Sequence, residues 1–102
     1  MRDPQILESV KATLALLVAA NPGRAIEVRI PPYAAVQVIP GISHKRGTPP
    51  AVIEMTARIW IDLAIGKIDW ITTKNSGAIS ASGERADLST LLPLISAQDL
   101  AN

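Results

Sequence analysis

The chain contains no cysteine and no phenylalanine, and it has only one histidine. Without cysteine there can be no disulfide scaffold, thiolate nucleophile, CxxC redox pair or Cys-ligated zinc. Basic and acidic residues nearly cancel, ten against nine, and they are spread along the sequence. Because no basic patch marks a nucleic-acid interface, we expect no nucleic acid among the partners.

The common catalytic and metal-binding patterns are also missing. His44 stands beside two basic residues, which disfavour a bound cation, and Gly41 opens a nucleophile-elbow pattern that lacks its second glycine. Gly66 follows a predicted helix and lacks the earlier glycine of a phosphate loop. Glu54, in an otherwise apolar segment, is interpreted as a solvent-facing or Arg-paired carboxylate. We therefore predict a protein that is not an enzyme, with no catalytic residue, metal or cofactor.

What the sequence does have is apolar material: 48% of its 102 residues are hydrophobic. That is enough for one packed core and too much for a disordered chain, so a single domain over residues 1–102 is expected. The absence of cysteine fits a cytoplasmic protein. No apolar run reaches the length of a membrane-spanning helix, which predicts no stable membrane anchor.

The first element is predicted to be an amphipathic helix. Asp3 is a suitable N-cap, Pro4 is acceptable at the first helical position, and Asn21 begins the stop signal. The alternative for residues 12–20 is the apolar part of a signal peptide, but the preceding charges cancel where such a peptide needs a positive leader. The helix is the preferred interpretation.

The hydrophobic pattern then predicts an α+β fold. Strands are expected at residues 26–30, 34–39, 51–55 and 78–82, and helices at 57–65, from Asp69 to just before Gly77, and at 88–92. Thr56 is a plausible cap for the helix at 57–65. Strands that follow one another in runs favour a mostly antiparallel sheet with helices packed on one face.

The segment 57–65 is apolar over most of its circumference, interrupted only by Arg58 and Asp62. A helix of this kind must be covered on nearly all sides. The cover could be other helices of a fully packed core, a partner subunit, or a bound apolar ligand. The sequence alone leaves all three open.

Residues 51–94 resemble the C-terminal half of the sterol carrier protein type-2 superfamily. The matching features are Leu63-Ala64-Ile65-Gly66-Lys67, then Gly77-Ala78-Ile79 with Gly83, and finally the leucines at 88, 91 and 92. The earlier stretch VRIPPYAAVQVIPG, followed by HKRGTPPAVIE, resembles a small stand-alone actinobacterial branch of that superfamily. The resemblance implies a sheet of about five strands, helices on one side, and a hydrophobic tunnel for lipids.

Two functions are therefore expected as alternatives. The first is non-enzymatic binding of an apolar small molecule (lipid, acyl chain or isoprenoid) in a hydrophobic cavity. The second is a protein-interaction module, forming a homodimer or serving as an accessory to an enzyme. The basic loop from Ser43 to Thr48 is the place where an acidic headgroup would first be sought. The predicted pocket walls are Trp60, Ile61, Leu63, Ala64, Ile65, Trp70, Ile71, Leu88 and Leu91.

Overall fold

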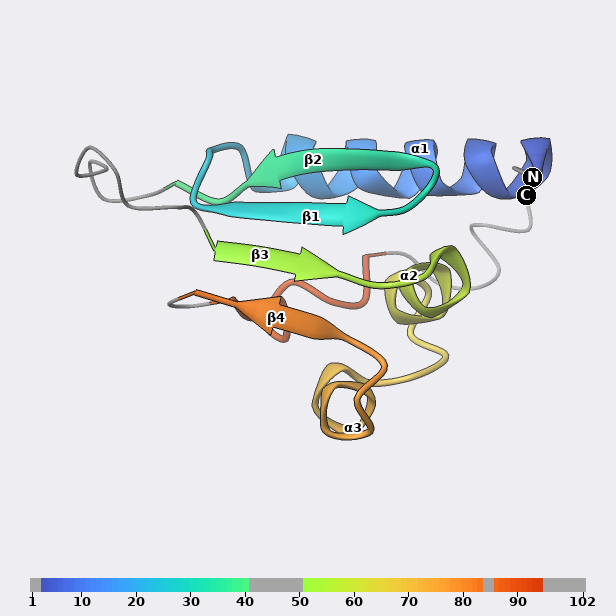
Figure 1. Ribbon diagram of the computed structural model, residues 1–102. Coiled ribbons are helices and arrows are strands. Elements are labelled where there is room, and N and C mark those ends of the chain that lie inside the picture. Colours follow the sequence, from blue (N-terminus) through green and yellow to red (C-terminus); the bar gives the residue numbers. More distant parts are fainter. Residues whose placement is uncertain (1–2, 41–50, 84–85, 95–102) are drawn as a thin grey trace.

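A computed structural model describes residues 3–40, 51–83 and 86–94 of the chain. Its elements, in order, are α1 (Pro4–Ala20), β1 (Ile26–Ile30), β2 (Ala34–Val38), β3 (Ala51–Glu54), α2 (Ala57–Ala64), α3 (Trp70–Asn75) and β4 (Ser80–Ser82) (Figure 1). The α+β class is confirmed, and each of these elements lies within two residues of its predicted bounds.

The helices begin where local chemistry satisfies their first backbone N–H groups. The Asp3 carboxylate accepts hydrogen bonds from the N–H groups of Gln5 and Ile6, at 2.8 and 3.3 Å. Thr56 Oγ1 accepts from Ile59 N at 3.3 Å, so it caps α2. These contacts are possible because short oxygen-bearing side chains reach the amides of the first helical turn. Both caps agree with the sequence-based prediction.

The described residues form one four-stranded sheet in the order β2-β1-β3-β4. β1 pairs antiparallel with β2 and parallel with β3, and β3 pairs antiparallel with β4. The sheet is therefore mixed but mostly antiparallel. It has four strands among the described residues, where the family resemblance implied about five.

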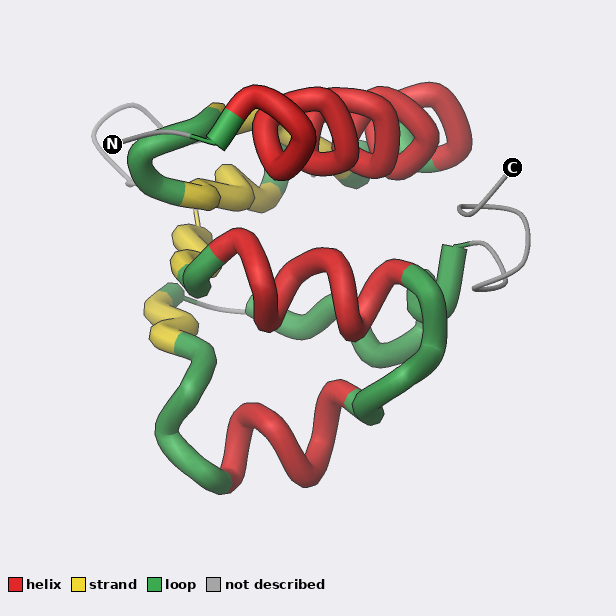
Figure 2. The backbone as a smooth tube through the Cα atoms, turned by 90° about the vertical axis from the view of Figure 1, so that its right-hand side faces the viewer, coloured by secondary structure: helices red, strands yellow, loops and turns green. Residues whose placement is uncertain are grey.

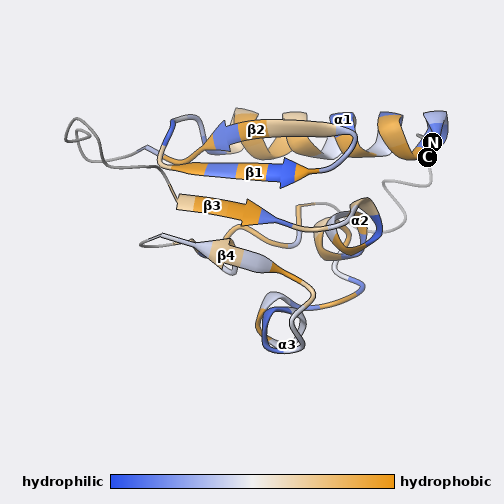
Figure 3. Ribbon diagram, in the orientation of Figure 1, coloured by the Kyte–Doolittle hydropathy of each residue, from blue (hydrophilic) through white to orange (hydrophobic). Residues whose placement is uncertain are grey.

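Hydrophobic and hydrophilic residues alternate along β1 (Figure 3), so the two faces of the sheet differ in polarity. Register places Val28, Val36 and Ile53 on one face, where Val28 and Ile53 are completely buried. Arg29 and Glu54 lie side by side on the other, exposed face. Helices α1 and α2 pack against each other on the same side of the strands (Figure 2). The predicted arrangement of helices on one face is thus correct.

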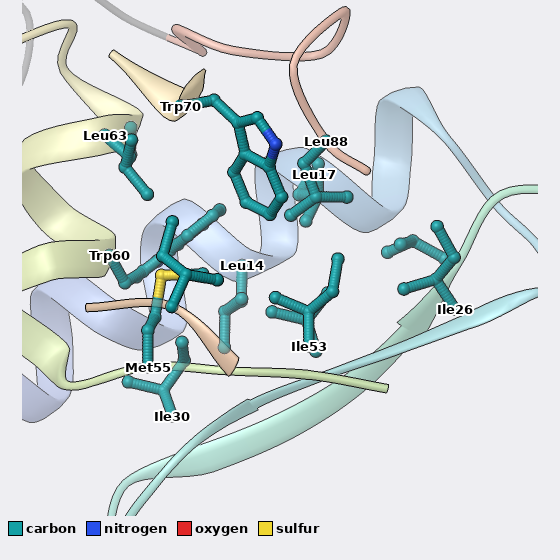
Figure 4. Packing of buried hydrophobic residues seen from close by; sticks show 14 of the residues in the cluster. Leu14, Leu17, Ile26, Ile30, Ile53, Met55, Trp60, Leu63, Trp70 and Leu88 are labelled. Carbon is teal, nitrogen blue, oxygen red and sulfur yellow. The ribbon is translucent and has the colours of Figure 1, made fainter. Parts of the chain in front are cut away.

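A single hydrophobic core joins the helices, the sheet and the segment after β4. Figure 4 shows buried side chains from all of these meeting in one cluster, including Leu17 of α1, Ile53 of β3, Trp60 of α2 and Leu88. The Trp60 indole N–H donates to Thr13 Oγ1 at 2.8 Å, and the Thr13 hydroxyl donates to the Ser9 carbonyl at 2.7 Å. This chain of bonds satisfies the polar atoms that the core encloses.

Helix α2 is covered less completely than its composition predicted. Its buried residues are Ala57, Trp60, Leu63 and Ala64. Ile59, Ile61 and Ile65 are only half-buried. Part of the surface of these three isoleucine side chains, on α2 and at its C-cap, is therefore accessible to solvent.

The predicted helix at residues 88–92 is wrong: residues 86–94 form an irregular segment with one turn. Leu91 N bonds Leu88 O at 2.9 Å, which closes the turn, and Leu94 N then bonds Ala64 O at 2.8 Å. Pro93 has no N–H to continue a helical ladder. The leucines whose spacing suggested a helix differ in burial: Leu88 is completely buried, and Leu91 and Leu92 are half-buried. Ile95, which continues the i, i+3, i+4, i+7 spacing of Leu88, Leu91 and Leu92, lies outside the described residues.

Candidate functional site

An open groove of about 430 Å³ lies where α2, α3 and the segment 86–94 meet. Its apolar walls are Leu63, Ile68, Trp70, Ile71, Leu92 and Pro93, and its polar lining is Gly66, Lys67, Asp69 and Ser89. This volume falls within the range typical of small-molecule sites. The groove is open to solvent and is not an enclosed tunnel.

One wall of the groove is the short connection between α2 and α3. Helix α2 ends at Ala64, and Gly66 adopts a positive φ of 78°, a conformation that glycine reaches without steric cost. The backbone N–H groups of Lys67 and Ile68 then donate to the carbonyl of Asp62, at 2.8 and 3.3 Å. These two bonds hold the connection tightly against the end of α2.

The neighbouring part of the wall, around Pro93, is held in place by a tertiary hydrogen bond. Leu94 N donates to the carbonyl of Ala64, so the chain around Pro93 lies against the end of α2. A Cβ atom at Gly66 would stand 3.2 Å from Pro93 Cβ, closer than ordinary van der Waals contact. Gly66 is therefore needed both for its backbone conformation and for the close approach of Pro93.

Helix α3 contributes one buried and one exposed apolar side chain to the site. Trp70 is 5% exposed and its indole points into the core, whereas Ile71 is 65% exposed (Figure 4). Among large apolar side chains in the described residues, only Ile71 and Leu16 of α1 are classed as exposed. Ile71 is thus an apolar side chain of the groove that the described residues leave uncovered.

The polar rim of the groove carries one charge of each sign. The Asp69 carboxylate accepts the Thr72 backbone N–H at 2.8 Å, capping α3, and this hydrogen bond lowers the pKa of Asp69 below its usual value. Lys67 is exposed and forms no ion pair with any residue that the structure describes. The Asp69 carboxylate therefore caps α3, while Lys67 has no ion-pair partner among the described residues.

The sequence-predicted pocket residues fall into three groups. Trp60, Leu63, Ala64 and Leu88 are buried in the core, and of these only Leu63 also lines the groove. Trp70 and Ile71 line the groove directly. Ile61, Ile65 and Leu91 are half-buried and do not line it. The structure thus brings three of these residues together in the groove.

Comparison with protein families identifies the chain. The family model described as "Bacterial SCP ortholog" matches residues 2–94. The chain belongs to the bacterial SCP ortholog family. No curated protein matches the sequence.

The motif that carried the resemblance coincides with the groove of this bacterial SCP ortholog. Leu63, Gly66 and Lys67 of the Leu-x-x-Gly-Lys pattern all line it. The sequence-based list of pocket residues omitted Gly66 and Lys67 because only apolar positions were selected. Ile68, Ser89, Leu92 and Pro93 were also missed; in the irregular segment 86–94, Leu92 and Pro93 line the groove in place of the predicted Leu88 and Leu91.

Two further features that the sequence singled out in this SCP ortholog are Glu54, which does not line the groove, and the basic loop from Ser43 to Thr48. Glu54 is exposed on the outer sheet face, as predicted, and it borders a second, smaller open hollow of about 290 Å³. Arg29, which is opposite Glu54 in the register, pairs with Glu27 instead. The loop from Ser43 to Thr48 lies outside the described residues.

Residues 3–40, 51–83 and 86–94 contain neither a candidate metal site nor a candidate membrane-spanning helix. No three His, Cys, Asp or Glu side chains in residues 3–40, 51–83 and 86–94 are placed to hold a metal ion. No helix in the same part of the chain is both long enough and apolar enough to cross a bilayer.

Proposed function

We propose that this protein binds an apolar small molecule, such as a lipid, acyl chain or isoprenoid, without catalysing a reaction. The observation that carries the proposal is the groove, whose six apolar side chains include the exposed Ile71. Membership of the bacterial SCP ortholog family adds support. A cytoplasmic location and an actinobacterial origin remain predictions from the sequence.

The physical basis of binding would be the removal of apolar surface from water. Each Å² of apolar area buried contributes about 25 cal/mol. A ligand chain lying in the groove would cover Ile71, Leu92 and the accessible edge of Trp70. Selectivity would then come from the shape of the groove and from the few polar atoms at its rim.

The test is a titration of ¹⁵N-labelled protein with 1-decanol, followed by NMR of the indole N–H signals. The chain has two tryptophans. Trp70 lines the groove, whereas the Trp60 indole is fully buried and bonded to Thr13. We expect a saturable shift of the Trp70 signal and a much smaller change at Trp60.

A lack of any saturable change at Trp70 with 1-decanol, fatty acids, sterols and isoprenoids would overturn the proposal. Equal shifts at both indoles would also contradict binding in this groove, since Trp60 is fully buried and does not line it. A fully assigned backbone spectrum would locate the binding surface in either case.

The second candidate function is self-association. The exposed face of the C-terminal half of α1 consists of Ala12, Ala15, Leu16, Ala19 and Ala20, without a charged side chain. Leu16 is 45% exposed. We expect light scattering of the wild type to distinguish the candidates: a strict monomer at high concentration without ligand would eliminate this one.

A further inference from the structure

The second hollow, of about 290 Å³, lies at the carboxyl ends of the parallel strands β1 and β3, where β4 begins (Figure 1). It shares no residue with the groove. We infer that this hollow binds a small primary ammonium ion beside Glu54, and that the occupant is a short, unbranched alkylamine. The inference does not depend on the proposed function, because it concerns a different site.

Two connections of the chain form the hollow. The first joins β3 to α2 and contains Thr56, whose Oγ1 caps α2 by accepting from Ile59 N at 3.3 Å. The second joins α3 to β4 and contains Gly77, which has a positive φ of 88°. A Cβ atom at Gly77 would meet nothing within 4 Å. Gly77 therefore borders space that the described residues do not fill.

Glu54 is the one charged side chain that the described residues place on this hollow. It is exposed, and it forms no ion pair with any residue of 3–40, 51–83 or 86–94. Its register partner Arg29 pairs with Glu27 instead. A carboxylate without a counter-ion gives this part of the surface a negative potential, which favours a cation.

The other polar groups of the hollow indicate which kind of cation fits. The hydroxyls of Thr56 and Ser80 line it together with Glu54, so oxygen acceptors come from three side chains. A primary ammonium has three N–H donors for such acceptors. Quaternary ammonium ions are recognised by aromatic faces, and no aromatic residue is among the described residues that line the hollow. The chemistry therefore favours a primary over a quaternary ammonium.

The rest of the lining sets the size of the ligand. Pro31, Met55 and Ala78 provide apolar surface for a short alkyl chain. At roughly 30 Å³ for an atom the size of a water molecule, about 290 Å³ holds about 10 non-hydrogen atoms. The n-butylammonium ion has about half that number, so it fits with room for a longer chain.

The experiment titrates ¹⁵N-labelled protein with n-butylammonium chloride at low salt and follows the backbone amides of Gly77, Ala78 and Ser80 by NMR. We expect saturable shifts at these amides. Tetramethylammonium is the matched probe, since it has the same charge and the same number of non-hydrogen atoms but no N–H donor. It should bind more weakly, because it cannot form charge-assisted hydrogen bonds with Glu54.

Two pairs of variants locate the site. Glu54→Gln should lower the affinity for n-butylammonium roughly two- to fivefold, as expected for an exposed ion pair. Glu8→Gln on α1 removes the same charge from an exposed residue that does not line the hollow, and it should leave the affinity unchanged. Ser80→Leu places a large side chain on the hollow and should also weaken binding. Ser82→Leu is its control, because Ser82 is exposed on the same face of β4 but does not line the hollow.

Three outcomes would overturn the inference. The first is the absence of any saturable shift at the three amides. The second is an equal affinity for the two cations, which would remove the role of the N–H donors. The third is an equal fall in Glu54→Gln and Glu8→Gln, which would reduce the effect to net charge. Each of these would leave the binding of 1-decanol in the groove as a separate question, since the two sites share no residue.

Discussion

Trp60 of α2 donates its indole N–H to the hydroxyl of Thr13 in α1, across 47 positions of sequence, at 2.8 Å. Both side chains are completely buried. The Thr13 hydroxyl donates in turn to the carbonyl of Ser9. The residue that interrupts the apolar run of α1 is thus the partner that allows a tryptophan to occupy the centre of the core.

Replacing Thr13 with valine should destabilise the protein by roughly 1–3 kcal/mol, because it leaves a buried indole N–H without an acceptor. The substitution keeps the volume of the side chain, so little of the loss comes from packing. Urea denaturation measures the difference. In a Trp60→Phe background, which has no donor, Thr13→Val should cost much less; an equal cost in both backgrounds would show that the hydrogen bond contributes nothing.

Replacing Gly66 with alanine should destabilise the protein more than the same change at Gly77. Both glycines have positive φ, 78° and 88°, where a Cβ atom costs about 1–2 kcal/mol. A Cβ atom at Gly66 would also meet Pro93, whereas at Gly77 nothing lies within 4 Å. Thermal denaturation of the two variants isolates the effect of this contact. Equal decreases in melting temperature would mean that Pro93 moves away from the added Cβ atom at no cost in stability.

The stability of the protein should fall in acid partly through Asp69. Its pKa in the folded state is lowered from 3.8 by the hydrogen bond from Thr72. The carboxylate therefore stabilises the fold above the unfolded-state pKa, and this contribution disappears as the pH falls through the lower, folded-state value. Unfolding midpoints of the wild type and Asp69→Asn, measured across this range, should converge in acid. Parallel curves would contradict the assignment.

Replacing Ile71 with serine should weaken binding of 1-decanol roughly threefold or more, since the ligand loses an apolar contact in the groove. Leu16→Ser is the matched control, because Leu16 is also a large exposed apolar residue but lies on α1. Both substitutions should change stability little, as expected at exposed positions. Equal affinities of the two variants would place the ligand elsewhere on the protein.

Local signals in the sequence were sufficient for most elements of this fold. Asp3, Thr56 and Asp69 each cap a helix through their own side chains, and these contacts span only two or three residues. The alternating pattern at residues 26–30 likewise predicted which face of β1 is buried. Such features can be predicted because the interacting atoms are neighbours along the chain.

The sequence by itself determined the α+β class, the helix starts and the excess of apolar side chains. Only the tertiary structure decided that β3 pairs parallel to β1, that residues 86–94 form an irregular segment, and that Trp60 lies in the core while Trp70 borders a groove. The physical reason is that a hydrophobic pattern specifies that a side chain avoids water, but not which distant surface shelters it. Here that choice depends on contacts such as Leu94 N to Ala64 O, which join residues 30 positions apart and leave no trace in local periodicity.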